Sequence, residues 1–154
     1  MLFRSEMASI AFRYDGYIDK FIGDGMMVVF GDPIARDDHA LSAVRAAIEM
    51  QKKVRELKQN WSNVNRFPIK IRIGINTGEV TVGNMGSKSR MDYTVLGANV
   101  NLAQRLEANA PMEGILISDA VYQKVKDHVQ TKPVSELHVK GLTERIIAYE
   151  VPVV

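Results

Sequence analysis

The chain has no cysteine, only 7% aromatic residues and a net charge of only +2, and each shortage excludes a class of protein. Without cysteine there is neither a disulfide framework nor a thiolate metal site, and three scattered histidines do not suggest a zinc site. The small net charge gives no electrostatic argument for a nucleic-acid or membrane partner. Composition therefore leaves an ordinary globular protein without an obvious ligand.

Long apolar runs are also missing. No run approaches the roughly 18 residues that a bilayer-spanning helix needs, and Arg4 and Glu6 interrupt the region where a signal peptide would be apolar. We therefore expect a cytoplasmic chain, although the whole protein can be membrane-attached through other domains. With 154 residues, 46% of them hydrophobic, the sequence predicts one domain over 1–154 that buries about two-thirds of its unfolded surface.

The spacing of apolar residues and turn signals predicts an alternation of helices and strands. The expected elements are a helix ending before 15–16, a hairpin of 17–22 and 26–30, a helix from 37 or 38 to 61, strands at 67–76 and 80–82, a loop at 83–89, a strand at 91–96, a helix at 99–108, a strand at 115–118, a helix capped by Ser118 or Asp119 through 125, and strands near 134–139 and 145–151. This order predicts an α+β fold with a mainly antiparallel sheet and helices on one face.

The tip of the first hairpin is one candidate site. Asp24 lies between Gly23 and Gly25, where the backbone is open enough for a phosphate to approach, and Lys20 precedes it on the strand. A hard cation such as Mg²⁺ can bind an aspartate together with phosphate oxygens. Aspartate and glycine are equally ordinary turn residues, so these residues alone leave a structural role open.

Asn101 and Arg105 form the second candidate site. They lie four residues apart on a predicted helix and so share one face, just after the Gly97 break. Arginine suits the charge of a transferring phosphoryl group, and asparagine can orient a hydroxyl. The polar face of an ordinary amphipathic helix is the simpler reading of the same two residues.

Four motifs in order carry a family resemblance over nearly the whole chain. They are Asp19-Lys-Phe-Ile-Gly-Asp24, Arg72-Ile-Gly-Ile-Asn-Thr-Gly-Glu-Val80, Arg90-Met-Asp-Tyr-Thr-Val-Leu-Gly97 and Asn99-Val-Asn-Leu-Ala-Gln-Arg-Leu-Glu107. Together they resemble the class III adenylate/guanylate cyclase catalytic domain. The resemblance implies a ferredoxin-like βαββαβ-type fold, and it implies conversion of ATP to 3′,5′-cyclic AMP and pyrophosphate for intracellular signalling.

The resemblance also implies a role for each matching residue. Asp24 matches the second of two metal-binding aspartates, and Lys20 and Thr94 match the pair that reads the purine. Asn101 and Arg105 match the pair that positions the ribose and stabilises the developing charge. The remaining expected substrate contacts are Phe21, Gly23, Val95 and Lys140. Lysine with threonine implies adenine and resembles the cyanobacterial and bicarbonate-responsive subgroup.

The expected ligands and partners follow from the same family. They are ATP, two Mg²⁺ or Mn²⁺ ions, and a second copy of the chain in a head-to-tail homodimer, in which the metal aspartates of one copy face the base-reading and Asn/Arg residues of the other. No nucleic-acid partner is expected.

The chain departs from the family pattern at its start. The first metal aspartate precedes the hairpin in the family, and before Asp15 the only acidic residue is Glu6, within a helical stretch. We therefore expect an N-terminally truncated domain, without its first strand, that is weakly active or inactive. The alternatives are a nucleotide-binding or dimerising regulatory module without catalysis, a guanylate cyclase, and, last, an RNA-binding sheet, for which the strands lack stacking aromatics.

Overall fold

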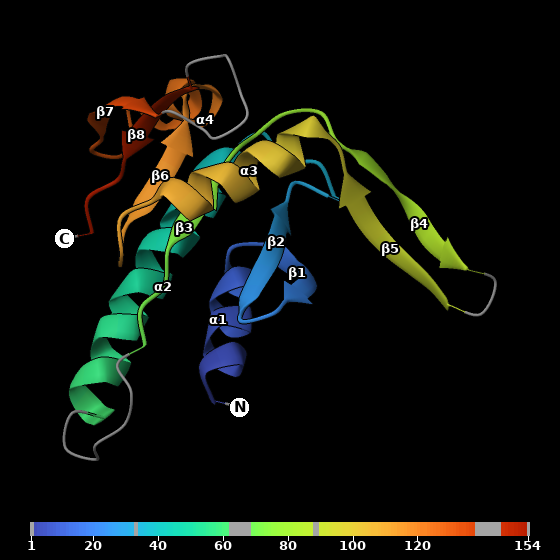
Figure 1. Ribbon diagram of the computed structural model, residues 1–154, viewed down its shortest axis with the longest axis horizontal. Helices are drawn as coiled ribbons and strands as arrows, with labels where there is room; N and C mark the ends of the chain where they lie inside the picture. Colours follow the sequence, from blue (N-terminus) through green and yellow to red (C-terminus); the bar gives the residue numbers. More distant parts are fainter. Residues whose placement is uncertain (1, 33, 62–68, 88–89, 138–145, 154) are drawn as a thin grey trace.

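The computed structural model describes residues 2–32, 34–61, 69–87, 90–137 and 146–153 (Figure 1). In chain order the elements are α1 Leu2–Arg13, β1 Gly16–Ile22, β2 Gly25–Phe30, α2 His39–Trp61, β3 Ile73–Ile75, β4 Thr81–Ser87, β5 Arg90–Leu96, α3 Ala98–Asn109, β6 Ile115–Ser118, α4 Asp119–Val125, β7 Lys132–Leu137 and β8 Ile146–Glu150. The expected helix cap before α4 is Ser118, whose hydroxyl accepts a hydrogen bond from the Val121 N–H at 3.3 Å.

The described strands form three sheets. One has four strands in the order β3-β6-β8-β7, and the other two are the hairpins β1-β2 and β4-β5. Only the β3-β6 pair is parallel, and the other four pairs are antiparallel. The predicted α+β class with mainly antiparallel pairing is confirmed.

Helices cover both faces of the four-stranded sheet. On one face Ile115 and Ile117 of β6 pack against α2 and α4, while Leu116, between them, packs against α3 on the other. Because successive strand residues point to opposite faces, a strand that is apolar at all three positions needs cover on both sides. The expected single layer of helices therefore holds for α2 and α4, and α3 differs from it.

A second core joins α1, α2 and the β1-β2 hairpin. Met7 and Ile10 of α1 are buried against α2, and partly buried side chains of β2 complete the cluster. The predicted end of the first helix is confirmed at Arg13, where Asp15 turns the chain at a φ of 65°. This core holds the base of the hairpin that carries Asp24.

Two strand predictions need correction. The stretch predicted as a loop at 83–89 is strand up to Ser87, because every residue from Thr81 to Ser87 pairs with β5 in register. The resulting hairpin projects away from the rest of the molecule (Figure 1). The strand predicted at 67–76 is confined to Ile73–Ile75 among the described residues. Its parallel partner β6 begins only at Ile115, opposite Ile73, and before that point the Glu113 N–H donates to the Ile71 carbonyl oxygen at 3.0 Å without a continuous ladder.

A buried polar residue adds to the backbone hydrogen bonds at the start of β3 and β6. The Gln51 amide nitrogen on α2 donates to the carbonyl oxygens of Ile71, at 3.1 Å, and Gly114, at 3.0 Å. The residue is 1% exposed, so these bonds satisfy groups that water cannot reach. Gln51 therefore ties α2 to the start of β3 and β6.

Candidate functional site

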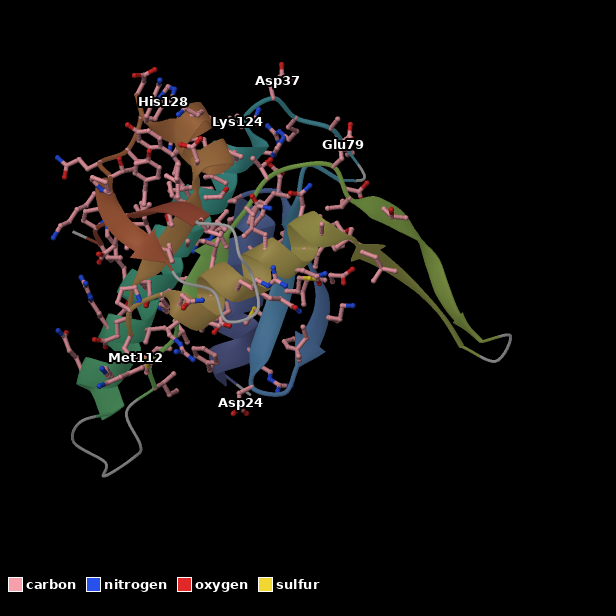
Figure 2. The ribbon with its side chains drawn as sticks, turned by 45° about the horizontal axis from the view of Figure 1, so that its top comes forward. Asp24, Asp37, Glu79, Met112, Lys124 and His128 are labelled. Carbon is pink, nitrogen blue, oxygen red and sulfur yellow. The ribbon has the colours of Figure 1, made fainter. Side chains whose placement is uncertain are left out.

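The β1-β2 hairpin presents Asp24 at its tip. Gly23 adopts a φ of 56°, and no atom lies within 4 Å of the position that a Cβ would take there. Asp24 is exposed, and Figure 2 shows it at the free end of the hairpin. With the other described residues its side chain forms no hydrogen bond or ion pair, so the carboxylate is available to a ligand.

Arg4 of α1 supports this tip. Its guanidinium carbon lies 4.6 Å from the ring centroid of Phe21, and its Nη2 donates to the Gly23 carbonyl oxygen at 3.3 Å. Phe21 is itself 47% exposed. The contacts hold the residues around the turn from outside the core.

Lys20 lies beside an irregularity in β1. Ile18 pairs with Val28 and Lys20 with Met27, so Asp19 is the extra residue of a β-bulge. The Asp19 side chain is fully buried, and its Oδ2 lies 3.8 Å from the Lys20 ammonium, which is part-exposed. The bulge thus directs a carboxylate inward and leaves the lysine facing solvent.

The other purine-reading candidate lies on a neighbouring strand. Thr94 pairs with Gly83 in the β4-β5 hairpin, and β5 contacts β1, the strand of Lys20. Val95 is 3% exposed, so its side chain belongs to the core and only its backbone is left to meet a substrate. Lys140 lies outside the described residues.

Helix α3 carries Asn101 and Arg105 on one face. Asn101 is exposed and Arg105 is half-buried, and neither side chain is hydrogen-bonded or ion-paired to another described residue. The helix behind them is held tightly. Leu106 is 1% exposed, and a Cβ on Gly74 of β3 would lie 2.2 Å from the Glu107 nitrogen. The candidate polar face is thus displayed by a helix that is fixed from its opposite side.

The described residues do not complete a metal site. Among them no group of three or more histidine, aspartate or glutamate side chains is placed to hold a cation. Asp24 supplies one carboxylate, whereas Mg²⁺ requires about six oxygen ligands. The residues present therefore do not by themselves fit the expected two-metal centre.

One pocket of about 220 Å³ lies far from these residues, between the start of α2 and the end of α4. Figure 2 shows its lining residues Asp37, Lys124 and His128 at the opposite side of the molecule from Asp24. Acidic and basic groups line it together, so it favours no ligand charge and is not part of the candidate site. No helix in the described ranges is long and apolar enough to cross a membrane.

The arrangement of these motifs matches a known family. Residues 3–152 match the model of the adenylate and guanylate cyclase catalytic domain. The chain belongs to this family. The class III resemblance and its fold are thereby confirmed, whereas the match does not distinguish a subgroup.

Both adenylyl cyclases and guanylyl cyclases are similar to this cyclase domain. Adenylate cyclase 1 of Rhizobium meliloti (strain 1021) is 33% identical over 148 residues, which are 94% of this chain and 22% of that protein. The crystal structure of the adenylyl cyclase CyaB from P. aeruginosa is 42% identical with a TM-score of 0.93, covering 98% of this chain and 79% of that chain. A non-canonical dimeric guanylyl cyclase domain of the RhoGC fusion protein from Blastocladiella emersonii is 29% identical with a TM-score of 0.84, covering 97% and 79%.

These similarities identify the family of the chain but not its substrate. The chain spans about a fifth of the length of the Rhizobium relative, so that protein's activity as a whole is not transferred. Because adenylyl and guanylyl cyclases both match, the matches do not decide between ATP and GTP. The roles of the individual site residues remain predictions.

Sequence reasoning missed two residues that hold the cyclase candidate site. Arg4 contacts the hairpin tip, and Asn99 bridges the start of α3 to the turn after β3. Arg4 gives no local signal, because its partners Phe21 and Gly23 lie seventeen and nineteen residues away. Asn99 does carry a local signal. It is an amide side chain two residues after the Gly97 break, where it can take the place of a missing helix cap.

Proposed function

We propose that this cyclase domain acts on ATP. The 3′ oxygen of the ribose attacks the α-phosphorus, the bond from that phosphorus to the bridging oxygen breaks, and pyrophosphate leaves. The proton of the 3′ hydroxyl passes to solvent. The products are 3′,5′-cyclic AMP and pyrophosphate, with no oxidant or second substrate needed.

The observation that carries this proposal is the face of α3. The side chains of Asn101 and Arg105 have no hydrogen-bond or ion-pair partner among the described residues, yet the helix beneath them is fixed by Leu106 and the close approach of Gly74. A donor that is held in place before the reaction stabilises developing negative charge without reorganising. Arg105 would take that role, and Asn101 would orient the ribose.

We assign recognition of the base to Lys20 and Thr94, which lie on the contacting strands β1 and β5. Lys20 is exposed on β1, and Thr94 lies on β5, which contacts β1. A lysine donates to a ring nitrogen acceptor, and a threonine hydroxyl both donates and accepts, so it can meet the adenine amino group directly or through a water. This pair favours ATP over GTP. Lys140 is assigned to the triphosphate, and Phe21, Gly23 and the Val95 backbone to its surroundings.

A second copy of the chain completes the site in this proposal. Within one chain, no hydrogen bond or ion pair between described side chains joins Asp24 to Asn101 or Arg105. A head-to-tail pair would place the hairpin tip of one copy opposite α3 of the other, and the related guanylyl cyclase domain from Blastocladiella emersonii is a non-canonical dimer. Asp24 would then contribute one ligand to Mg²⁺ or Mn²⁺ beside the substrate phosphates.

Turnover by this chain is expected to be slow. Asp24 offers one carboxylate, and the described residues complete no cation site. The same observation favours a second candidate, a domain that binds nucleotide and dimerises without catalysis. The two candidates differ in product formation and agree in binding.

The test measures both properties on the same protein. Cyclic nucleotide formation is assayed with ATP or GTP and Mn²⁺, and binding of a non-cyclisable ATP analogue is followed by calorimetry. We expect slow cyclic AMP formation that Arg105→Ala lowers about a hundredfold, or about 3 kcal/mol of transition-state stabilisation. Arg45→Ala, on the exposed face of α2, is the matched control and leaves the rate unchanged.

Each result decides between the candidates. Analogue binding without cyclic AMP supports the binding module and rejects the cyclase. Cyclic GMP as the main product rejects the adenine assignment of Lys20 and Thr94. Neither binding nor product rejects both.

A further inference from the structure

The first turn of α3 lacks the usual stabilisers of a helix start. Its N-cap is Gly97, with φ 133° and ψ 177°, and no side chain caps the turn. No acidic residue lies in the first turn either. The N–H groups of Val100 and Asn101 both donate to the Gly97 carbonyl oxygen, at 3.1 and 3.2 Å. This turn carries Asn101, so whatever holds it also holds the candidate site.

The Asn99 side chain fixes the first turn of α3 in place of a side-chain cap. Its Oδ1 accepts a hydrogen bond from the Asn76 amide at 3.1 Å, and its own Nδ2 donates to the Glu79 carbonyl oxygen at 2.8 Å. The Asn76 amide also donates to the Asn99 backbone oxygen at 3.0 Å. One amide therefore joins the first turn of α3 to residues on both sides of the turn between β3 and β4.

The turn is shaped around this amide. A Cβ on Gly78 would lie 2.4 Å from the Asn99 Nδ2, a distance that real side chains do not tolerate. Only glycine lets the backbone come this close. The bridge thus depends on three positions, Asn76, Gly78 and Asn99, that belong to two separate segments of the chain.

Asn99 and Asn101 lie on opposite sides of α3, so the bridge can hold the helix without covering the candidate site. Asn99 precedes Asn101 by two residues, or about 200° around a helix, so the two side chains point to opposite sides. Asn99 is half-buried and faces the turn, whereas Asn101 is exposed. The second half of α3 is anchored by Leu106 and Gly74, and the bridge anchors the first half.

We propose that Asn99 is a positioning residue, whose amide bridge to Asn76 and Glu79 sets the place of Asn101 for the reaction. The functional half of this inference rests on the proposed function, and the structural half does not. Losing the bridge would let the first turn of α3 fray, so that Asn101 meets the transition state less often while substrate binding through Lys20 and Thr94 persists.

The experiment compares Asn99→Ala with Asn109→Ala. Asn109 is also on α3, and its Nδ2 donates to the Arg105 carbonyl oxygen at 2.7 Å, but this bond stays within the helix. Amide hydrogen exchange of Val100 and Asn101 should rise about tenfold in Asn99→Ala, as for the loss of one or two hydrogen bonds. It should remain unchanged in Asn109→Ala.

Turnover gives the second readout. Asn99→Ala should lower kcat for cyclic AMP formation about tenfold with KM nearly unchanged, and it should add no further loss in an Asn101→Ala background. Asn99→Asp keeps the acceptor for Asn76 but sets an oxygen against the Glu79 carbonyl, so it should not restore kcat.

The outcomes separate the two proposals. Unchanged exchange in Asn99→Ala overturns the positioning role, and so does faster exchange with unchanged kcat. If the unsubstituted chain neither binds the ATP analogue nor forms cyclic AMP, the proposed function has failed. The exchange rates then still decide whether Asn99 fixes the start of α3.

Discussion

The hairpin tip and helix α3 carry the two groups of candidate residues, and the fold holds them in different ways. Asp24 and Gly23 project into solvent. There the Arg4 side chain of α1 donates to the Gly23 carbonyl oxygen and lies over the Phe21 ring. Helix α3 instead packs its inner side against β3 and β6 and exposes its polar side. Substitutions beneath α3 should therefore lower both the free energy of unfolding and the activity of the site. Substitutions at the tip should change the site with little effect on stability.

The largest effect is expected beneath α3. Leu106→Ala removes a side chain that is 1% exposed and leaves a cavity between α3 and β6, which should lower the free energy of unfolding by about 3 kcal/mol. Urea unfolding followed by circular dichroism measures this change. Leu96→Ala, at a leucine that is 42% exposed, is the matched control and should cost well under 1 kcal/mol. Equal losses at the two leucines would contradict the contrast.

The approach of β3 to α3 gives the next largest effect. Gly74→Ala places a methyl group 2.2 Å from the Glu107 nitrogen and 2.6 Å from the Ala103 oxygen. Backbone atoms cannot move aside cheaply, so we expect a loss of about 2 kcal/mol and a displaced Arg105. Gly83→Ala, where the added Cβ meets no atom within 4 Å, should change the free energy of unfolding little. A thermal melt of both variants would show whether they differ.

At the tip the expected change in stability is smaller. Arg4→Ala removes a cation over the Phe21 ring and a hydrogen bond to the Gly23 carbonyl oxygen, all in solvent. We expect a loss of about 0.5 kcal/mol. Chemical denaturation is the measurement, with Arg45→Ala as the control for removing a surface arginine. A loss as large as that of Leu106→Ala would show that the tip is part of the core after all.

The smallest effect depends on pH. Glu113, at the turn between α3 and β6, accepts a hydrogen bond from the Lys58 ammonium at 2.5 Å, which lowers the pKa of its carboxyl below the ordinary value of 4.5. A lowered folded-state pKa contributes stability above pH 4.5, and that contribution is lost as pH falls through the folded-state value.

Glu113→Gln should therefore destabilise the chain near neutral pH by at most about 0.5 kcal/mol, because the pair is partly exposed. At pH 3 the two proteins should differ less. Unfolding midpoints at both pH values test this, and a difference that grows as the pH falls would reverse the assigned sign.

The sequence predicted the parts of this cyclase domain whose signals are local. The β1-β2 hairpin follows from two apolar runs around Gly23 and Gly25, and α3 from the break at Gly97. The β4 strand was misread because Gly83 and Gly86 resemble loop residues, and only pairing with β5 keeps them extended. A strand stabilised by its partner carries little of that information in its own residues.

The side of each helix was harder to predict than its length. No sequence pattern singled out Gln51 of α2, yet its side chain is buried and its amide donates to two carbonyl oxygens. The cover that α3 gives to Leu116 depends on Gly74, which reads as an ordinary glycine within a strand. Both are contacts between distant segments, so local periodicity does not contain them.

The site residues were found by motif and remain predictions. Lys20, Asp24, Asn101 and Arg105 lie on surfaces where a ligand can reach them, whereas Val95 is buried and Lys140 lies outside the described residues. Their supports, Arg4 and Asn99, were not predicted, because each acts on backbone groups of another segment.

The most direct test mixes two variants of the chain, Asp24→Ala and Arg105→Ala, and measures cyclic AMP formed from ATP with Mn²⁺. If one copy supplies the hairpin tip and the other supplies α3, half of the dimers in an equal mixture are mixed, and each mixed dimer keeps one of its two sites intact. The mixture should then reach roughly a quarter of the unsubstituted rate while each variant alone stays near background. A mixture no faster than the two variants measured separately would contradict a site shared between copies.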